Sequence, residues 1–205
     1  SQGRPALLKN MLAMAADTDP LVVRSVAAEA GSASDFAPSR VQALAKIAEQ
    51  WSSKDDWIRL TLASADRSLL KALSHKIASK KQMDVLLLKH LVERIGIESP
   101  VDSVVIVLAA GVLGDQGSVL NRRQVELLNA WVWGVRKSRQ TVAKVIADLP
   151  EHQRVGLQSL VSRTLQTARA ATVSADTRAA CLLLAADFGQ VNTPLRELVS
   201  DASPP

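Results

Sequence analysis

Amphipathic helical segments follow one another along almost the whole chain, separated by short loops. Their apolar residues recur in steps of three and four, the spacing that places side chains on one face of a helix. The clearest such stripe runs through Asn121, Val125, Leu128, Val132 and Val135. No segment alternates apolar and polar residues convincingly at period two, and no Asn-Gly or Asp-Gly hairpin signal occurs. The sequence therefore predicts an all-α fold.

Helix-start and helix-end residues divide the chain into about twelve short helices. Asp19-Pro20 and Ser99-Pro100 each combine an N-cap side chain with a proline, whose missing N–H costs nothing in the first turn. Gly31, Gly96 and Gly189 are expected to end helices, Gly31 in the left-handed conformation that glycine tolerates. The expected helices cover residues 7–15, 20–30, 41–51, 56–65, 66–77, 82–95, 100–113, 121–135, 141–149, 150–165 and 174–188, with a last one opening at Thr193-Pro194.

The composition agrees with closely packed helices in one domain. Ala supplies 30 and Leu 28 of the 205 positions, whereas Trp and Phe supply only 4 and 2 and Tyr is absent. Ala and Leu lead the helix propensity scale, and aromatic residues favour strands. A chain of this length fits a single domain, which we place at residues 1–200, followed by a polar tail at residues 201–205.

A faint repeat indicates that the helices form pairs stacked in chain order. Asp19-Pro20-Leu21-Val22-Val23-Arg24 and Asp55-Asp56-Trp57-Ile58-Arg59 both join an acidic cap, apolar residues and an arginine, and a weaker copy occurs at residues 175–178. Such an aspartate can pair with the arginine of its own or the next unit. We therefore expect a right-handed α–α superhelix, a HEAT- or armadillo-like solenoid, of about six helix pairs. A plain helix bundle is the alternative, although bundles use fewer and longer helices.

These residues resemble HEAT-like repeats, whose second helix commonly opens with an Asp-Pro-x-x-Arg signature. More narrowly, residues 19–24, 43–48 and 55–59 resemble the helical-repeat region of planctomycete-type membrane-bound dehydrogenase and haem-binding proteins. In that family the solenoid lies between a β-propeller and a cytochrome-c-like domain. The resemblance implies a periplasmic location and neighbouring redox domains, and otherwise the cell compartment stays unknown.

The chain offers no motif that would carry redox or hydrolytic chemistry. It contains no Cys-x-x-Cys-His for haem attachment, no Gly-x-Ser-x-Gly and no phosphate-binding glycine loop. His75, His90 and His152 lie far apart and lack a second ligand at helical spacing, and Cys181 lies in an apolar run typical of a core. We therefore expect no catalytic residue, no cofactor and no metal, and we do not expect an enzyme.

The longest apolar stretch, residues 104–113, is too short to cross a membrane. As a helix it would reach about 15 Å, half of the hydrocarbon thickness. It is expected to be a buried core helix. Since the chain begins with Ser1 and opens with no basic-then-apolar leader, we expect an excised or processed chain.

One tryptophan stands out as a candidate contact residue. Trp51 and Trp131 follow apolar stripes, and Trp57 is expected to pack between units. Trp133 instead has Asn129, Arg136 and Lys137 as helical neighbours, and an indole beside two cations suggests a contact surface. The candidate interaction residues are Trp133, Arg136, Lys137 and Arg123. The plain alternative is that a neighbouring unit covers Trp133.

These observations favour a non-catalytic scaffold or protein-interaction module. Its partner would be a neighbouring domain of the same polypeptide or a partner segment. The alternative is a HEAT-like DNA-binding protein or DNA glycosylase that uses a basic, Trp-containing concave face. The net charge of +5 is mild, and Lys80-Lys81, Arg4 and Lys9 lie away from the basic residues of 121–139, so protein is the favoured partner.

Overall fold

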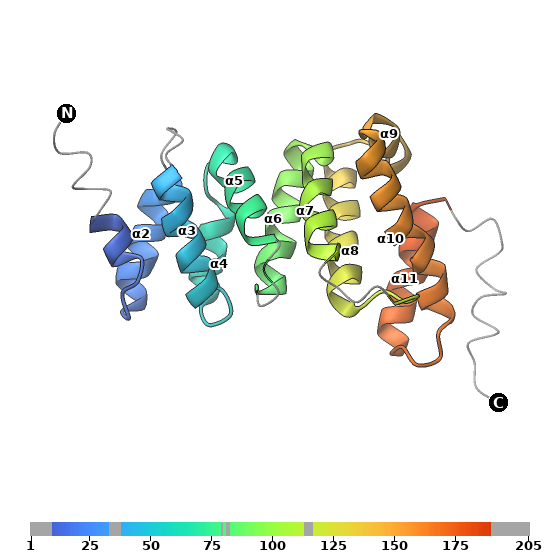
Figure 1. Ribbon diagram of the computed structural model, residues 1–205, viewed down its shortest axis with the longest axis horizontal. Coiled ribbons are helices and arrows are strands. Elements are labelled where there is room, and N and C mark those ends of the chain that lie inside the picture. Colours follow the sequence, from blue (N-terminus) through green and yellow to red (C-terminus); the bar gives the residue numbers. More distant parts are fainter. Residues whose placement is uncertain (1–9, 33–37, 79, 81–82, 113–116, 190–205) are drawn as a thin grey trace. The chain divides into compact units, whose positions relative to one another are not determined.

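Helices alone make up the regular structure of the part of the chain that the computed structural model describes, namely residues 10–32, 38–78, 80, 83–112 and 117–189 (Figure 1). The prediction of an all-α fold is thereby confirmed. The chain divides into two compact units, Ser1–Ile95 and Gly96–Pro205. We describe each unit by itself.

The first unit contains α2 (Pro20–Ser32), α3 (Pro38–Trp51), α4 (Asp56–Ala63), α5 (Arg67–Ala78) and most of α6 (Val85–Glu98), after a helical turn at residues 10–14. Helix α2 packs against α3 and α4, and α3 packs against α4 and α5. Near the start of α2, the Arg24 guanidinium donates a hydrogen bond to the Asp55 carboxylate at the start of α4. Near the end of α2, the Gly31 carbonyl accepts a hydrogen bond from the Asp66 N–H, which follows α4. Helices α2 and α4 therefore run parallel, side by side.

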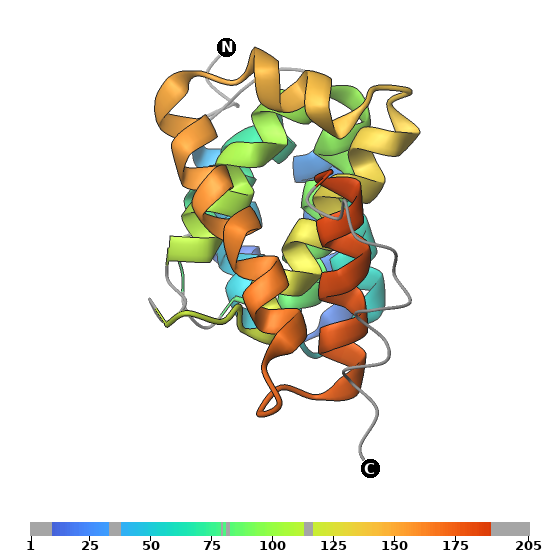
Figure 2. The ribbon, with the colours of Figure 1, turned by 90° about the vertical axis from the view of Figure 1, so that its right-hand side faces the viewer.

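The second unit repeats this arrangement with one inserted short helix. It contains α7 (Pro100–Val112), α8 (Arg122–Lys137), α9 (Val142–Asp148), α10 (Glu151–Arg169) and α11 (Ala175–Asp187). Helix α7 packs against α8 and α10, α11 packs against α8 and α10, and α9 lies on α7 and α8. Figure 2 shows α11 beside α8. Each long helix thus contacts both its antiparallel hairpin partner and the corresponding helix of the next pair.

Aliphatic side chains on the inward faces form the core of each unit. In the first unit the fully buried residues include Leu44, Ile47, Ile58, Leu62, Leu69, Leu73 and Ile77. In the second they include Leu127, Leu128, Trp131, Val135, Leu157 and Leu184. The predicted stripe at Val125, Leu128, Val132 and Val135 is therefore the buried face of α8, whereas Trp51 is only half-buried.

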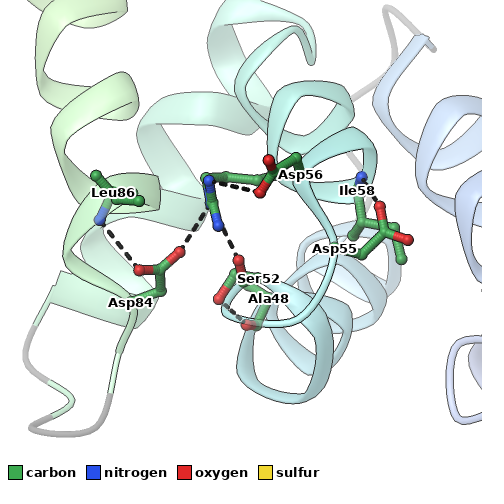
Figure 3. Close-up of polar contacts among 8 residues, drawn as sticks. Ala48, Ser52, Asp55, Asp56, Ile58, Asp84 and Leu86 are labelled. Atoms are coloured by element: carbon green, nitrogen blue, oxygen red, sulfur yellow. Dashed lines mark hydrogen bonds and ion pairs between the residues drawn. The ribbon is translucent and has the colours of Figure 1, made fainter.

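Polar side chains cap the helices as their positions predict. The Asp55 carboxylate accepts from the Ile58 N–H at 3.0 Å at the start of α4 (Figure 3). Asn121 and Gln124 exchange hydrogen bonds in a capping box that opens α8. The Thr141 hydroxyl accepts from the Lys144 N–H at the start of α9, and the Ser174 hydroxyl accepts from the Thr177 N–H at the start of α11. These caps satisfy N–H groups that have no partner within the helix.

Two of the three expected glycine stops are wrong. Gly31 lies inside α2 and Gly96 inside α6, whereas Gly189 follows α11 with a φ of 67°. A Cβ atom at Gly31 would lie 3.1 Å from the Ala65 Cβ, and one at Gly96 would lie 3.3 Å from the Gly134 Cα. Both glycines therefore permit close approach of neighbouring segments. The helix expected at Thr193-Pro194 lies outside the described residues.

Candidate interaction surface on α8 and α11

Trp133 lies on the outward face of α8, as the sequence suggests. Its side chain is 45% exposed, and the Lys137 Nζ lies 5.1 Å from the centre of its ring. The two residues are one turn apart, so the ammonium group sits over the indole in a cation–π contact. Among the described residues of the second unit, no neighbouring helix covers Trp133.

The rotation of α8 is fixed by Trp131, two residues earlier. Trp131 is completely buried, and its Nε1 donates to the Pro100 carbonyl at 3.2 Å. Its ring lies 6.1 Å from the ring of Phe188, at an interplanar angle of 19°. Two helical residues differ by about 200° in direction. Burying Trp131 therefore turns Trp133 outward.

Arg136 lies on the same face but is already paired. Its guanidinium forms an ion pair with the Asp187 carboxylate at the end of α11. The pair joins the ends of α8 and α11, whose first halves also lie side by side along a shared cavity. Helices α8 and α11 therefore run parallel. Leu183, one turn before Asp187, is 65% exposed and adds an apolar side chain from α11.

Arg123, the fourth sequence candidate, has a different environment. Its side chain is half-buried, and burial lowers the pKa of its guanidinium because desolvation disfavours the charged form. It also has interactions within the chain. The structure therefore places Trp133, Arg136 and Lys137 together near the end of α8, with Arg123 at its start.

A half-open cavity of about 270 Å³ lies between the first halves of α8 and α11. Its lining is mixed, with Val125 and Ala180 among polar residues: Arg122, Glu126, Asn129, Ser174, Asp176 and Thr177. The Arg122 Nε lies 2.7 Å from the Glu126 Oε1, and this bond raises the pKa of Arg122. The cavity therefore lies on the same two helices as Trp133 and the Arg136–Asp187 ion pair, nearer to the helix starts.

The contribution of α11 is what sequence reasoning missed. Asp187 lies 51 residues from its ion-pair partner Arg136, and Asp176 lines the cavity with α8 residues about fifty positions earlier. Residues 175–187 have a weak apolar periodicity, because small alanines occupy both faces. Only the pairing of α8 with α11 in space brings these groups to one surface.

The other two tryptophans, Trp51 and Trp57, lie in the first unit. The sequence predicts that Trp57 packs between two helix pairs. This prediction is wrong, because the side chain is 68% exposed at the start of α4. Trp51 is half-buried, and the Lys54 Nζ lies 5.8 Å from its ring centre.

Cys181 is completely buried, as expected, and burial raises the pKa of its thiol to about 11. Such a thiol is inert at neutral pH.

Among the described residues, no three His, Cys, Asp or Glu side chains are placed to hold a metal ion. His75 and His152 are exposed on different helices, and the His90 Nδ1 lies 3.9 Å from Glu93 within its own helix. None of the helices in this part of the chain is long and apolar enough to cross a membrane. Comparison with protein-family models, with curated proteins and with solved structures finds no match.

Proposed function

We propose that the chain is a non-catalytic, HEAT-like α-solenoid that serves as a scaffold and protein-interaction module. The observation that carries this proposal is the repeated stacking of alternate helices. In the first unit α2 lies parallel to α4, and in the second α8 lies parallel to α11. A pair of short helices cannot shield its own apolar face, so contact with the next pair supplies the missing cover.

Two arginines support this view, because each bridges the starts of two alternate helices. Arg24 of α2 binds Asp55 at the start of α4, and Arg59 of α4 binds Asp84 at the start of α6 at 2.9 Å. A bridge repeated from one helix start to the next is the pattern expected of a stack. We extend it to a right-handed superhelix of about six pairs over residues 1–200.

Trp133, Lys137 and Leu183 support the interaction role. They combine a large exposed indole, an exposed aliphatic side chain and a cation on two rigid, parallel helices. Exposed aromatic residues on a fixed support are typical anchors of protein interfaces. The partner would bring an apolar anchor beside a carboxylate that meets Lys137. By the family resemblance, it would be a neighbouring redox domain of a longer polypeptide.

Nucleic acid is the second candidate, since Trp133 stands beside cations. The charge pattern favours it less, because Glu126 pairs with Arg122 and Asp187 pairs with Arg136. Asp176 adds a further carboxylate to the same face. A surface that neutralises phosphates needs cations that are free to release counterions.

A pair of labelled probes separates these functions. The first is a 16-residue amphipathic helical peptide with Leu on one face and Glu beside it, and the second is a 20-base-pair DNA duplex. We expect the peptide to bind, and Trp133→Ser to weaken it roughly tenfold. Trp57→Ser, a matched change of an exposed tryptophan elsewhere, should leave its affinity unchanged. Equal loss with both variants, or duplex binding that falls steeply between 50 and 200 mM salt, would contradict the proposal.

A further inference from the structure

The cavity between the first halves of α8 and α11 has hydrogen-bonding groups that the described part of the chain does not use. The side-chain amide of Asn129, half-buried on α8, and the carboxylate of Asp176, on α11, both line it. Neither side chain forms a hydrogen bond or ion pair with another described residue. A partly buried amide without a partner costs free energy, which a ligand can recover by bonding to it. The cavity therefore offers open acceptors to a ligand.

The charge of the cavity lining favours a cation. Three charged side chains line the cavity, namely Arg122, Glu126 and Asp176. Arg122 and Glu126 neutralise each other, since the Arg122 Nε donates to the Glu126 Oε1 at 2.7 Å. The Asp176 carboxylate is left uncompensated in this lining, which makes the cavity negative although the chain as a whole carries a charge of +5. An anion would face this carboxylate while Arg122 is already occupied.

The size and the walls of the cavity fit one long side chain. Its volume of about 270 Å³ lies below the range of roughly 300–1,000 Å³ that is typical of pockets for drug-sized ligands. Val125 and Ala180 form an apolar part of the lining. The methylene stem of a lysine or arginine can pack against such a wall while its charged end meets polar atoms.

The acceptors around the cavity favour a guanidinium over an ammonium group. The Asp176 carboxylate is on α11, and the Asn129 side-chain carbonyl is on α8. The Ser174 and Thr177 hydroxyls, whose oxygens lie 2.9 Å apart, add two more acceptors. A guanidinium has five N–H donors in one plane and can serve several acceptors at once, whereas an ammonium is a compact charge with three donors. These oxygens therefore match the side chain of an arginine.

The cavity lies beside the Trp133 surface that the proposed function assigns to a partner protein. Asn129 is four residues before Trp133, so the two side chains lie on one face of α8, about 6 Å apart along the helix axis. We propose that the cavity receives an arginine side chain of this partner, one to two helical turns from the apolar residue that contacts Trp133. The source of the arginine rests on the proposed function, whereas the affinity of the cavity for a guanidinium does not.

The first test titrates N-acetyl-arginine amide into the isotopically labelled full chain and follows it by NMR. We expect saturable shifts of the Asn129 side-chain amide and of the Thr177 and Ala180 backbone amides. N-acetyl-citrulline amide, which has a similar shape without the charge, should cause none. Asp176→Asn should weaken the arginine probe roughly fivefold or more. Glu151→Gln, which removes an acid from the first turn of α10, should stay within about twofold of the wild type.

Three results of this titration would overturn the inference. They are an absence of shifts at the cavity, equal shifts with the citrulline probe, and wild-type affinity for the arginine probe in Asp176→Asn.

A filled cavity provides a second variant. Ala180→Leu places a larger side chain in the lining, and Ala179→Leu makes the same change at an exposed neighbour that does not line it. Leucine is a good helix former, so circular dichroism of both variants should match the wild type. Only Ala180→Leu should abolish the shifts caused by the arginine probe. Shifts that persist in Ala180→Leu would place the guanidinium elsewhere and contradict the inference.

The helical peptide of the proposed function tests the source of the arginine. One version carries an arginine, and the other a citrulline, one and two helical turns from the central Leu. We expect the arginine version to bind the wild type roughly fivefold more tightly, and the two versions to bind Asp176→Asn equally. Equal binding of both versions to the wild type would contradict a partner arginine. If neither version binds while the arginine probe still shifts the cavity amides, the proposed interaction role fails and the guanidinium site stands.

Discussion

Arg24 of α2 donates a 2.5 Å hydrogen bond to Asp55, the residue that caps α4, and so joins the first turns of two parallel helices. Asp55 has two tasks at once, because its other oxygen accepts the Ile58 N–H at 3.0 Å. Its side chain is 11% exposed. A single carboxylate therefore closes one helix and fastens it to its neighbour.

Substitution of Asp55 should separate these two tasks. Asp55→Ala removes the cap and leaves Arg24 without its carboxylate, and should lower the free energy of unfolding by about 2–4 kcal/mol. Asp55→Asn keeps a good capping side chain and should cost about half as much. Urea unfolding at pH 7 measures both values. Equal losses in the two variants would mean that the cap contributes nothing.

The same residue predicts a pH dependence. The bond from Arg24, followed by that from the Ile58 N–H, holds the pKa of Asp55 below its ordinary value. A carboxylate with a depressed pKa stabilises the fold above its unfolded pKa, near 3.9, and loses this effect as the pH falls through its folded pKa. The stability difference between wild type and Asp55→Asn should therefore be constant from pH 7 to about 5 and shrink below about pH 4. Urea midpoints across this range test it, and a difference that grows on acidification would refute it.

Trp131 and Trp133 should respond in opposite ways to truncation. Trp131 is buried, stacked on Phe188 and bonded to Pro100, so Trp131→Ala should cost about 3–5 kcal/mol. Trp133 is half-exposed, and Trp133→Ala should change the unfolding free energy by about 0.5 kcal/mol or less. Chemical unfolding of both variants gives the comparison. Comparable losses would show that Trp133 belongs to the core.

Arg139 follows α8 with a φ of 62°, a left-handed conformation that costs a side-chain-bearing residue free energy. Arg139→Gly should therefore raise the unfolding free energy by about 1 kcal/mol, and Arg139→Val should lower it. Thermal unfolding measures the sign. A loss of stability in the glycine variant would show that the arginine side chain stabilises this turn by more than the strain costs.

Local chemistry was readable from the sequence where it depends on neighbours in the chain. The cap at Asp55, the buried stripe of α8 and the Asp–Arg bridge follow from spacing and side-chain type. Whether each tryptophan is buried or exposed is harder to predict from the sequence. Trp57 and Trp131 both adjoin apolar positions, yet the first is exposed and the second buried. Their difference depends on which helices pack from outside.

The roles of glycines, and of ion pairs between residues far apart in the sequence, likewise depend on which helices pack together. Gly31 reads as a helix stop, but its role depends on Ala65, which approaches from the end of α4. Asp187 reaches Arg136 only because α11 lies beside α8. Periodicity within one helix contains no information about which other helix will lie against it. Sequence reasoning therefore found the α8 half of the candidate surface and missed the α11 half.

Small-angle X-ray scattering tests the proposed stacking most directly, because a closed globule and an open array of helix pairs differ in size at equal length. A compact chain of 205 residues should have a radius of gyration of about 17 Å. The solenoid account predicts a clearly larger value, about 20 Å or more, with a distance distribution that trails toward long distances. A value near 17 Å with a symmetric distribution would contradict it.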